Sequence, residues 1–300
     1  MAVVQGNAAL ASDFNTLRGE VNRWFADNYA GSISFGNGNQ TYGWGGAAAA
    51  AVGQGNAMTA AQMNTLIDRC NIGEDIVALV IGTLPNIVAG NAMTAAEFNA
   101  IESKSDILTT NRLGMEGTEL SLGNGGNSVR SVTWGAGIDC IFRYTFTSFD
   151  KARYFFNSGG AFSIHAIITG YSTGTGWDGA GFNEIFTTMG TIIMDYTNTI
   201  QSGSGGTPTS IGYYDLTTSW QLIFSQTGTG AYTDALCNVY AKRNASGSYI
   251  EVAVGLIPGA GRSVNGTTTV TTQRRKLDNQ SSGAASLTIT APTYSLQDAL

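Results

Sequence analysis

Residues 90–101 read GNAMTAAEFNAI, and nearly the same twelve residues occur twice earlier, as GNAALASDFNTL at 6–17 and GNAMTAAQMNTL at 55–66. In the second and third copies Thr59 and Thr94 stand three residues before a Gln or a Glu. This is the capping-box pattern, in which two side chains satisfy free amides at a helix N-terminus. Each copy therefore predicts the start of a helix, and the Gly-Asn before it predicts the bend that leads in.

Apolar residues follow each phrase at helical spacing. In the first copy, where Leu10 replaces the capping Thr, they form a stripe of Phe14, Leu17, Val21, Trp24 and Phe25. The copies are unequally spaced along the chain, which argues against a solenoid. We therefore expect residues 1–112 to be a helical docking region with three helices. The Gly-rich stretch between the first two copies is interpreted as an ordered loop, pinned to the helices by Tyr42 and Trp44.

The pattern changes from helical to alternating further along the chain. Residues 113–128 are Gly-rich and predict a linker, and residues 129–300 predict a β-sandwich. Its expected strands are SVTWGAGIDCIFRYTFTS, GAFSIHAIITG, SWQLIFSQT, ALCNVYAKRN, GSYIEVAVGLI and NGTTTVTTQ. NASG at 244–247 predicts a hairpin turn. SFDKARYFFNSGG at 148–160 predicts a short helix that begins after Ser148 and covers one end of the sandwich. The fold class is thus α+β, with an N-terminal helical part followed by an antiparallel β-sandwich.

Charge is scarce and unevenly placed. Charged residues make up 12% of the chain, against about 25% in typical soluble domains. Residues 1–120 carry 11 acidic and 5 basic side chains, so no basic surface of the kind that holds a phosphate backbone is expected. The one basic run, Arg274-Arg275-Lys276, is interpreted as a solvated loop. Binding to nucleic acid is disfavoured.

The cysteines and the apolar stretches exclude further classes. Cys70, Cys140 and Cys237 are far apart and have no metal-ligand spacing, so we expect three buried thiols, no metal site and no cofactor. Residues 76–90 are too short, and too broken by Gly and Pro, to span a bilayer. The first residues lack the basic and apolar regions of a secretory signal, so membrane insertion is not expected.

Several of these motifs occur together in one family. The succession FNTLRGEVNRWF, QTYGWG and AMTAAQMNTLIDRCN, followed by SFDKARYFFNSGGAF, resembles a family of virion proteins of tailed bacteriophages, cyanophages included. The resemblance covers residues 5–165 and continues weakly at LTITAPTYS near the end, and the third helix phrase departs from the two-helix pattern of the family. It implies a structural component of the virion, of the tail, fibre or baseplate, and a symmetric homotrimer. We rank a dimer second and a monomer bound to a larger shell third.

Catalytic constellations are poorly represented. A nucleophilic triad needs a His or another base beside Ser or Cys, and the single His165 alternates with apolar residues on a predicted strand. It is therefore interpreted as a core or sheet-face residue. A glycosidase needs two paired carboxylates, and no motif pairs the acids of the middle region, which are Asp178, Glu184, Asp195 and Asp215. We expect no enzyme, with a polysaccharide depolymerase as the remaining catalytic alternative.

Carbohydrate or receptor binding is the stronger alternative. Exposed Trp and Tyr rings offer flat apolar faces to sugar rings, and polar neighbours take the hydroxyls. The candidates, which lie in predicted loops or at strand ends, are Tyr171, Trp177, Asp178, Tyr213 and Tyr214. A role for these rings as loop anchors is the competing interpretation.

The sequence thus favours a non-enzymatic protein of the virion, assembled in the cytoplasm of the host bacterium. The helical part would dock onto other virion proteins or onto further copies of this chain, and the β part would project. A host surface glycan is a possible further partner, and a capsid decoration protein is a further alternative.

Overall fold

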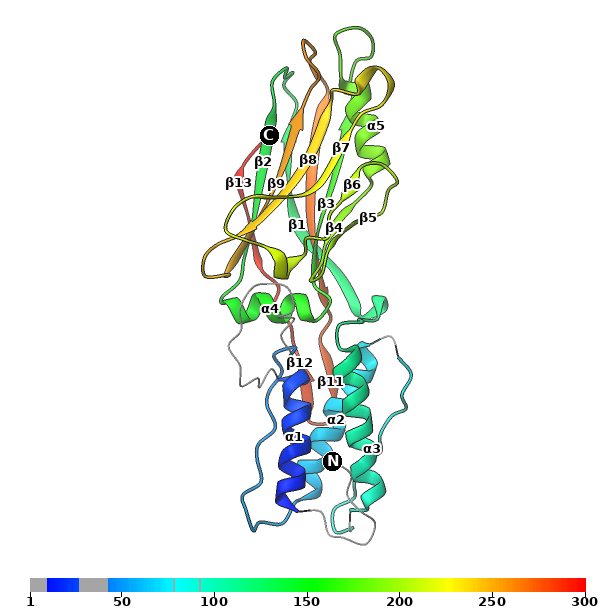
Figure 1. The fold of residues 1–300 in the computed structure, drawn as a ribbon, viewed down its shortest axis with the longest axis vertical. Coiled ribbons are helices and arrows are strands. Elements are labelled where there is room, and N and C mark those ends of the chain that lie inside the picture. The colour runs from blue at the N-terminus through cyan, green and yellow to red at the C-terminus, as the bar shows by residue number, and fades with distance from the viewer. Residues whose placement is uncertain (1–9, 27–42, 78, 92) are drawn as a thin grey trace.

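The computed structural model describes residues 10–26, 43–77, 79–91 and 93–300, and it is elongated, with helices at one end and antiparallel sheets at the other (Figure 1). The expected α+β class with a helical part before a β-sandwich is confirmed. We call the two parts the helical body and the β body. The helices are α1 (Ala11–Phe25), α2 (Ala60–Ile76), α3 (Ala95–Asn111), α4 (Phe149–Asn157) and α5 (Gly179–Met189), with single 3-10 turns at Gly117–Glu119, Tyr213–Asp215 and Gly230–Tyr232.

The repeated phrases start helices as predicted. Thr59 Oγ1 accepts from the amide of Gln62 at 3.3 Å, and Gln62 Oε1 accepts from the amide of Thr59 at 2.9 Å. Thr94 and Glu97 make the same two bonds, at 3.2 and 2.7 Å. Both capping boxes are therefore confirmed, and each satisfies two amides that a helix leaves free at its N-terminus.

Helix α1 begins without a Thr but keeps half of the cap. The amide of Leu10 donates to Asp13 Oδ2 at 2.9 Å. The stripe that follows is buried inside the helical body, where it packs against the other two helices, and its members are Phe14, Leu17, Val21, Trp24 and Phe25. Trp44 packs edge-on against Trp24, with ring centroids 5.4 Å apart, which confirms its predicted anchoring role. Tyr42 lies outside the described residues.

After α1 and after α2 the chain runs back beside the helix it has just left, as residues 44–52 and 79–88. We call these the return segments. Four Asn side chains each donate to one carbonyl and accept from the amide of the same residue in a return segment. These Asn clamps join Asn15 to Val52, Asn22 to Ala49, Asn64 to Ile87 and Asn71 to Leu84, with all eight bonds between 2.7 and 3.1 Å.

The spacing of the Asn clamps follows from elementary geometry. Seven residues separate the two Asn of each helix, which is a rise of about 10.5 Å at 1.5 Å per residue. Three residues separate their partners, and an extended chain covers about 10 Å in that distance. Helix and return segment therefore stay in register over both clamps, and backbone groups that have no helix or sheet partner are satisfied.

A cation from the next helix completes each inner clamp. Arg69 of α2 donates to Asn22 Oδ1 at 2.9 Å, and Lys104 of α3 donates to Asn71 Oδ1 at the same distance. Lys104 is only 1% exposed and is also paired with Glu74, so the buried charge is compensated. The clamps thus tie the helices to one another as well as to the return segments.

The β body contains two facing sheets. The five-stranded sheet has the order β1-β10-β3-β4-β5, and the six-stranded sheet has the order β13-β2-β9-β8-β7-β6. Tyr144 of the six-stranded sheet stacks on Phe162 of the five-stranded sheet at 3.8 Å between ring centroids, in the core between them. The strands are β1 (Leu120–Arg130), β2 (Ile138–Thr145), β3 (Ala161–Thr169), β4 (Ile192–Met194), β5 (Thr199–Gln201), β6 (Thr207–Pro208), β7 (Gln221–Thr227), β8 (Leu236–Arg243), β9 (Tyr249–Ile257), β10 (Thr267–Leu277) and β13 (Thr293–Asp298).

The linker predicted at 113–128 is wrong in its second half, because residues from Leu120 onward form β1, an edge strand paired with β10. The Gly residues that suggested a linker allow close contacts. A Cβ at Gly125 would lie 2.0 Å from the carbonyl oxygen of Thr272, and one at Gly126 would lie 2.1 Å from the ring of Tyr294. The strand is therefore Gly-rich because its neighbours approach the backbone.

The predicted boundary of the β-sandwich at 129–300 also needs correction. After β10 the chain leaves the sheets and forms the hairpin β11 (Gln280–Ser282) and β12 (Ala285–Leu287), which packs on α2 (Figure 1). Asp68 accepts from the amide of Ala284 at 2.9 Å, and Leu287 is buried.

The prediction that the basic run is a solvated loop is wrong. Arg274, Arg275 and Lys276 lie on β10, the strand that joins the two bodies.

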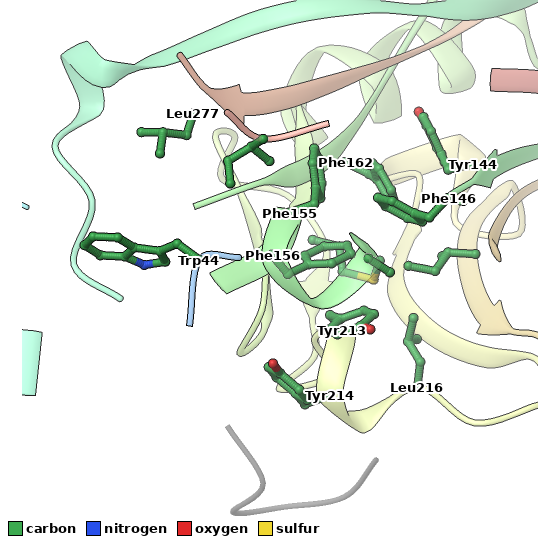
Figure 2. Packing of buried hydrophobic residues seen from close by; sticks show 14 of the residues in the cluster. Trp44, Tyr144, Phe146, Phe155, Phe156, Phe162, Tyr213, Tyr214, Leu216 and Leu277 are labelled. Atoms are coloured by element: carbon green, nitrogen blue, oxygen red, sulfur yellow. The ribbon is translucent and has the colours of Figure 1, made fainter. Parts of the chain in front are cut away.

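The motif at 148–160 forms α4 as predicted, at the junction of the two bodies. Ser148 Oγ caps it by accepting from the amide of Lys151 at 3.2 Å. Figure 2 shows Phe155 and Phe156 among other aromatic rings. Both are fully buried, and Phe156 stacks on Tyr213 at 4.3 Å while Phe155 lies 5.6 Å from Phe162.

The Gly-Gly exit of this motif has a steric reason. A Cβ at Gly160 would lie 2.3 Å from the carbonyl oxygen of Phe155, and Gly159 has a φ of 78°. Arg153 is buried and is paired with Asp150 at 3.1 Å. The motif is therefore a packing element between the helices and the sheets.

Replacing Asn64 by Ala tests the Asn clamps. The change leaves the amide and the carbonyl of Ile87 without their partner, and a buried unsatisfied group costs about 1–3 kcal/mol. We expect the free energy of unfolding in urea to fall by about that amount. Asn111→Ala is the control, because Asn111 bonds to Ile107 in its own helix and its loss should stay within about 0.5 kcal/mol. Equal losses in the two variants would contradict the clamp.

Candidate functional site

The three repeated phrases lead into helices that all begin at the end of the helical body remote from the sheets (Figure 1). Gly55 and Gly90 turn the chain there, with φ values of 82° and 91°.

A cleft of about 660 Å³ lies between the start of α1 and the second phrase, and it is lined by Leu10, Ala11, Ser12, Asn15 and residues 54–58. None of these lining residues is ionisable, and Leu10 is 62% exposed. This end therefore offers a partner apolar and uncharged polar groups.

The opposite end of the molecule consists of four loops, which we call the distal loops: residues 131–137, 170–178, 228–235 and 258–266 (Figure 1). Three of them are bonded to one another through their backbones, and the loop 228–235 is joined to 258–266 by Asp234, whose carboxylate accepts from the amide of Ala260 at 3.2 Å. Trp134 and Val264 exchange two bonds, at 2.9 and 2.7 Å, and the amide of Asp178 donates to Ser263 at 2.9 Å. The distal loops are thus one connected surface rather than four separate hairpin ends.

Three of the predicted binding residues lie in the distal loops. Tyr171 and Trp177 are half-buried, so each retains an accessible part. Asp178 is fully buried, accepts from the amide of Gly259, and pairs with Arg262 Nη1 at 2.9 Å. Its carboxylate therefore holds two loops together and has no free face for a ligand.

Tyr213 and Tyr214 lie at the other end of the β body, in the core beside α4 (Figure 2). The hydroxyl of Tyr214 donates to Asn157 Oδ1 at 2.7 Å. Burial raises the pKa of Tyr213 well above its ordinary value, so this ring remains a neutral core residue. The two rings are packing anchors, and the structure does not bring them together with Tyr171 and Trp177.

The acids weighed for catalysis each have a structural partner. Glu184 accepts from the hydroxyl of Thr229, Asp195 accepts from the amides of a turn at Thr197, and Asp215 accepts from the amide of Gly212. His165 lies on β3 with its side chain on the outward face of the sheet.

Tyr232 and Arg262 also belong to the distal loops, and no motif in the sequence pointed to them. The guanidinium of Arg262 lies 5.6 Å from the ring centroid of Tyr232, and it is also 3.3 Å from Asp234. Asp178 and Arg262 are 84 positions apart in the chain, so only the fold brings them together. A cation, two carboxylates and three partly accessible aromatic rings thus share this end.

Comparisons of the chain with protein-family models, with curated proteins and with solved structures gave no match. In the described part of the chain, no helix is long and apolar enough to cross a membrane. Within the same residues, no group of three or more His, Cys, Asp or Glu side chains is placed to hold a metal ion.

Replacing Arg262 by Ala tests the connection between the distal loops. The buried Asp178 carboxylate loses its cation, and we expect the loops to open more often. Chymotrypsin should then cleave after Tyr171, Trp177 or Tyr232 faster than in the unmodified protein. Arg130→Ala is the control, because Arg130 ends the neighbouring strand β1 and should leave the cleavage rate unchanged. Unchanged cleavage in Arg262→Ala would show that the ion pair does not hold these loops.

Proposed function

We propose that this chain is a bacteriophage virion structural protein, a projecting component of a tail fibre or baseplate. It docks by the free end of its helical body and displays the β body, with the distal loops outermost. The observation that carries the proposal is the polarity of the elongated molecule, which has the repeated phrases at one end and the distal loops at the other.

The motifs that resemble phage virion proteins also support this proposal. The helix phrases build the helical body through their caps and Asn clamps, and the ARYFFNSGG motif is buried at the junction. These residues therefore define a scaffold, and a shared scaffold is what a family of structural proteins needs. The candidate acids are bonded to other residues of the fold, and His165 lies on the outward face of a sheet. These positions give no support to a depolymerase.

A carbohydrate- or receptor-binding module of the particle is the second candidate. It is favoured by the accessible parts of Tyr171 and Trp177 in the distal loops, the end that would face a host cell. Release of reducing sugar from host polysaccharide would instead indicate an enzyme. Saturable binding without turnover would favour the receptor module. If neither sugar release nor binding is observed, only the structural role is supported.

We place self-association on the β body rather than on the helices. The stripe of α1 is fully used inside its own chain, so it offers nothing to a second copy. The outward face of the five-stranded sheet instead carries a cross-strand row of Ile167, Thr269 and Val129, in which Ile167 is 44% and Val129 51% exposed. The outward positions of β3 and of residues 267–273 hold no Asp, Glu, Lys or Arg, so identical faces would not repel one another.

Cysteine labelling tests which end docks. Burial raises the pKa of Cys70 and of Cys237 to about 12, and it also raises the pKa of Cys140. The native thiols should therefore not react with maleimide at pH 7. We expect Thr175→Cys, in the distal loops, to react equally in the free protein and on phage particles. Gln54→Cys, at the repeated phrases, should react in the free protein but be protected on particles. Reversed protection would place the distal loops against the particle.

Light scattering tests the self-association. We expect the unmodified protein to be a trimer at micromolar concentration and Ile167→Glu to be a monomer of 31.3 kDa, because three buried carboxylates would repel one another. The control is Leu122→Glu, which changes an exposed apolar residue at the other end of β1 from Val129. If the unmodified protein is a monomer, the proposed self-association is contradicted, and the chain would assemble only on the virion.

A further inference from the structure

A depression lies on the outward face of the six-stranded sheet, away from both ends of the molecule. Its volume is about 240 Å³, and it is lined by Asp139, Ile141, Trp220, Tyr240, Ala253 and Gly255. The strand register explains it. Gly255 and Ala253 lie on the central strand β9, between Asp139 and Ile141 of β2 on one side and Asn238 and Tyr240 of β8 on the other. Two small residues between larger neighbours leave a hollow.

Two aromatic rings stand at the depression. Trp220 directly precedes β7 and is 38% exposed, and Tyr240 is half-buried. Lys242 Nζ lies 4.3 Å from the centroid of the Trp220 ring and 3.0 Å from Glu251 Oε2. Burial would raise the pKa of Glu251, but its bonds to Arg143 and Lys242 lower it below the ordinary value. Glu251 therefore stays ionised, and it fixes the lysine on which the indole rests.

One ionisable side chain, Asp139, lines the depression. It is exposed, so its carboxylate can accept hydrogen bonds from a ligand there. The hydroxyl oxygen of Tyr240 accepts from Asn238 at 3.1 Å. A ligand for this place should therefore bring hydroxyl or amide donors for Asp139 together with a flat apolar face.

A cation is a poor match for the same rings. Lys242 already lies over the indole, and Glu251 is already paired with Lys242 and with Arg143, which is 2.8 Å away. A second cation would have to share the Trp220 ring with Lys242 and would find Glu251 already paired, although aromatic rings beside a carboxylate are otherwise suited to a cation. The volume lies just under the range of about 300–1,000 Å³ that is typical of drug-sized ligands, so it suits one small unit.

We propose that this depression binds a neutral pyranose ring of a saccharide, stacked on Trp220 or Tyr240 and bonded through its hydroxyls to Asp139. The proposal does not depend on which end of the chain docks onto a virion. It also differs from the binding residues expected from the sequence, because none of them lines this depression.

Saturation-transfer NMR with the methyl glycosides of glucose, galactose and mannose tests the proposal on the full chain. We expect transfer from at least one glycoside, with a dissociation constant on the order of 1 mM, and binding at least about tenfold weaker in Trp220→Ala. Leu122→Ala, which shortens an exposed apolar side chain on β1 of the other sheet, is the control and should bind as the unmodified protein does.

A second variant does not remove an aromatic ring. A Cβ at Gly255 would meet no atom within 4 Å, so Gly255→Val should fold normally while its side chain fills the depression. It should abolish the transfer. The proposal is overturned if no glycoside gives transfer, if both variants bind like the unmodified protein, or if tetramethylammonium displaces the sugar and binds more tightly.

Discussion

The helical body depends on the bonds that four Asn side chains make to the return segments. A chain that runs beside a helix without joining a sheet leaves its amides and carbonyls unpaired, and burial of such groups is costly. Each Asn amide supplies one donor and one acceptor to a single residue of the return segment, as a neighbouring strand would. Arg69 and Lys104 then connect each inner clamp to the next helix. Without the clamps, the three short helices would have no fixed register with the chain between them, and isolated helices of this length are marginal.

This arrangement gives the repeated phrase its physical meaning. Each copy leads into a helix, and the first two copies also supply the first Asn of a clamp, Asn15 and Asn64, which fixes the segment that returns beside that helix. All copies therefore lie at one end, and the other end of the helical body is left to join the sheets through β10 and the hairpin β11–β12 (Figure 1). The polarity of the molecule, on which the proposed docking rests, follows from the repeat.

Local signals in the sequence predicted the helix caps, most of the long strands and the hairpin turn at 244–247, because each depends on residues a few positions apart. Strand β1 was missed because Gly125 and Gly126 suggest a flexible segment, whereas the structure places them where Thr272 and Tyr294 approach the backbone closely. The clamps had a signal that was overlooked, an Asn five positions after the cap and another seven positions later in the first two copies. The burial of Tyr213 and the depression beside Trp220 could not be predicted from neighbouring positions in the sequence, because the residues that surround them come from distant parts of the chain.

Hydrogen exchange of the four clamped amides tests the role of the Asn clamps most directly. Ala49, Val52, Leu84 and Ile87 belong to no helix or strand, so an ordinary loop would exchange them within the dead time of the experiment. We expect them to exchange as slowly as amides inside α1 and α2, because they open only when the helical body unfolds. Fast exchange at these four positions beside slow exchange in the helices would contradict the account.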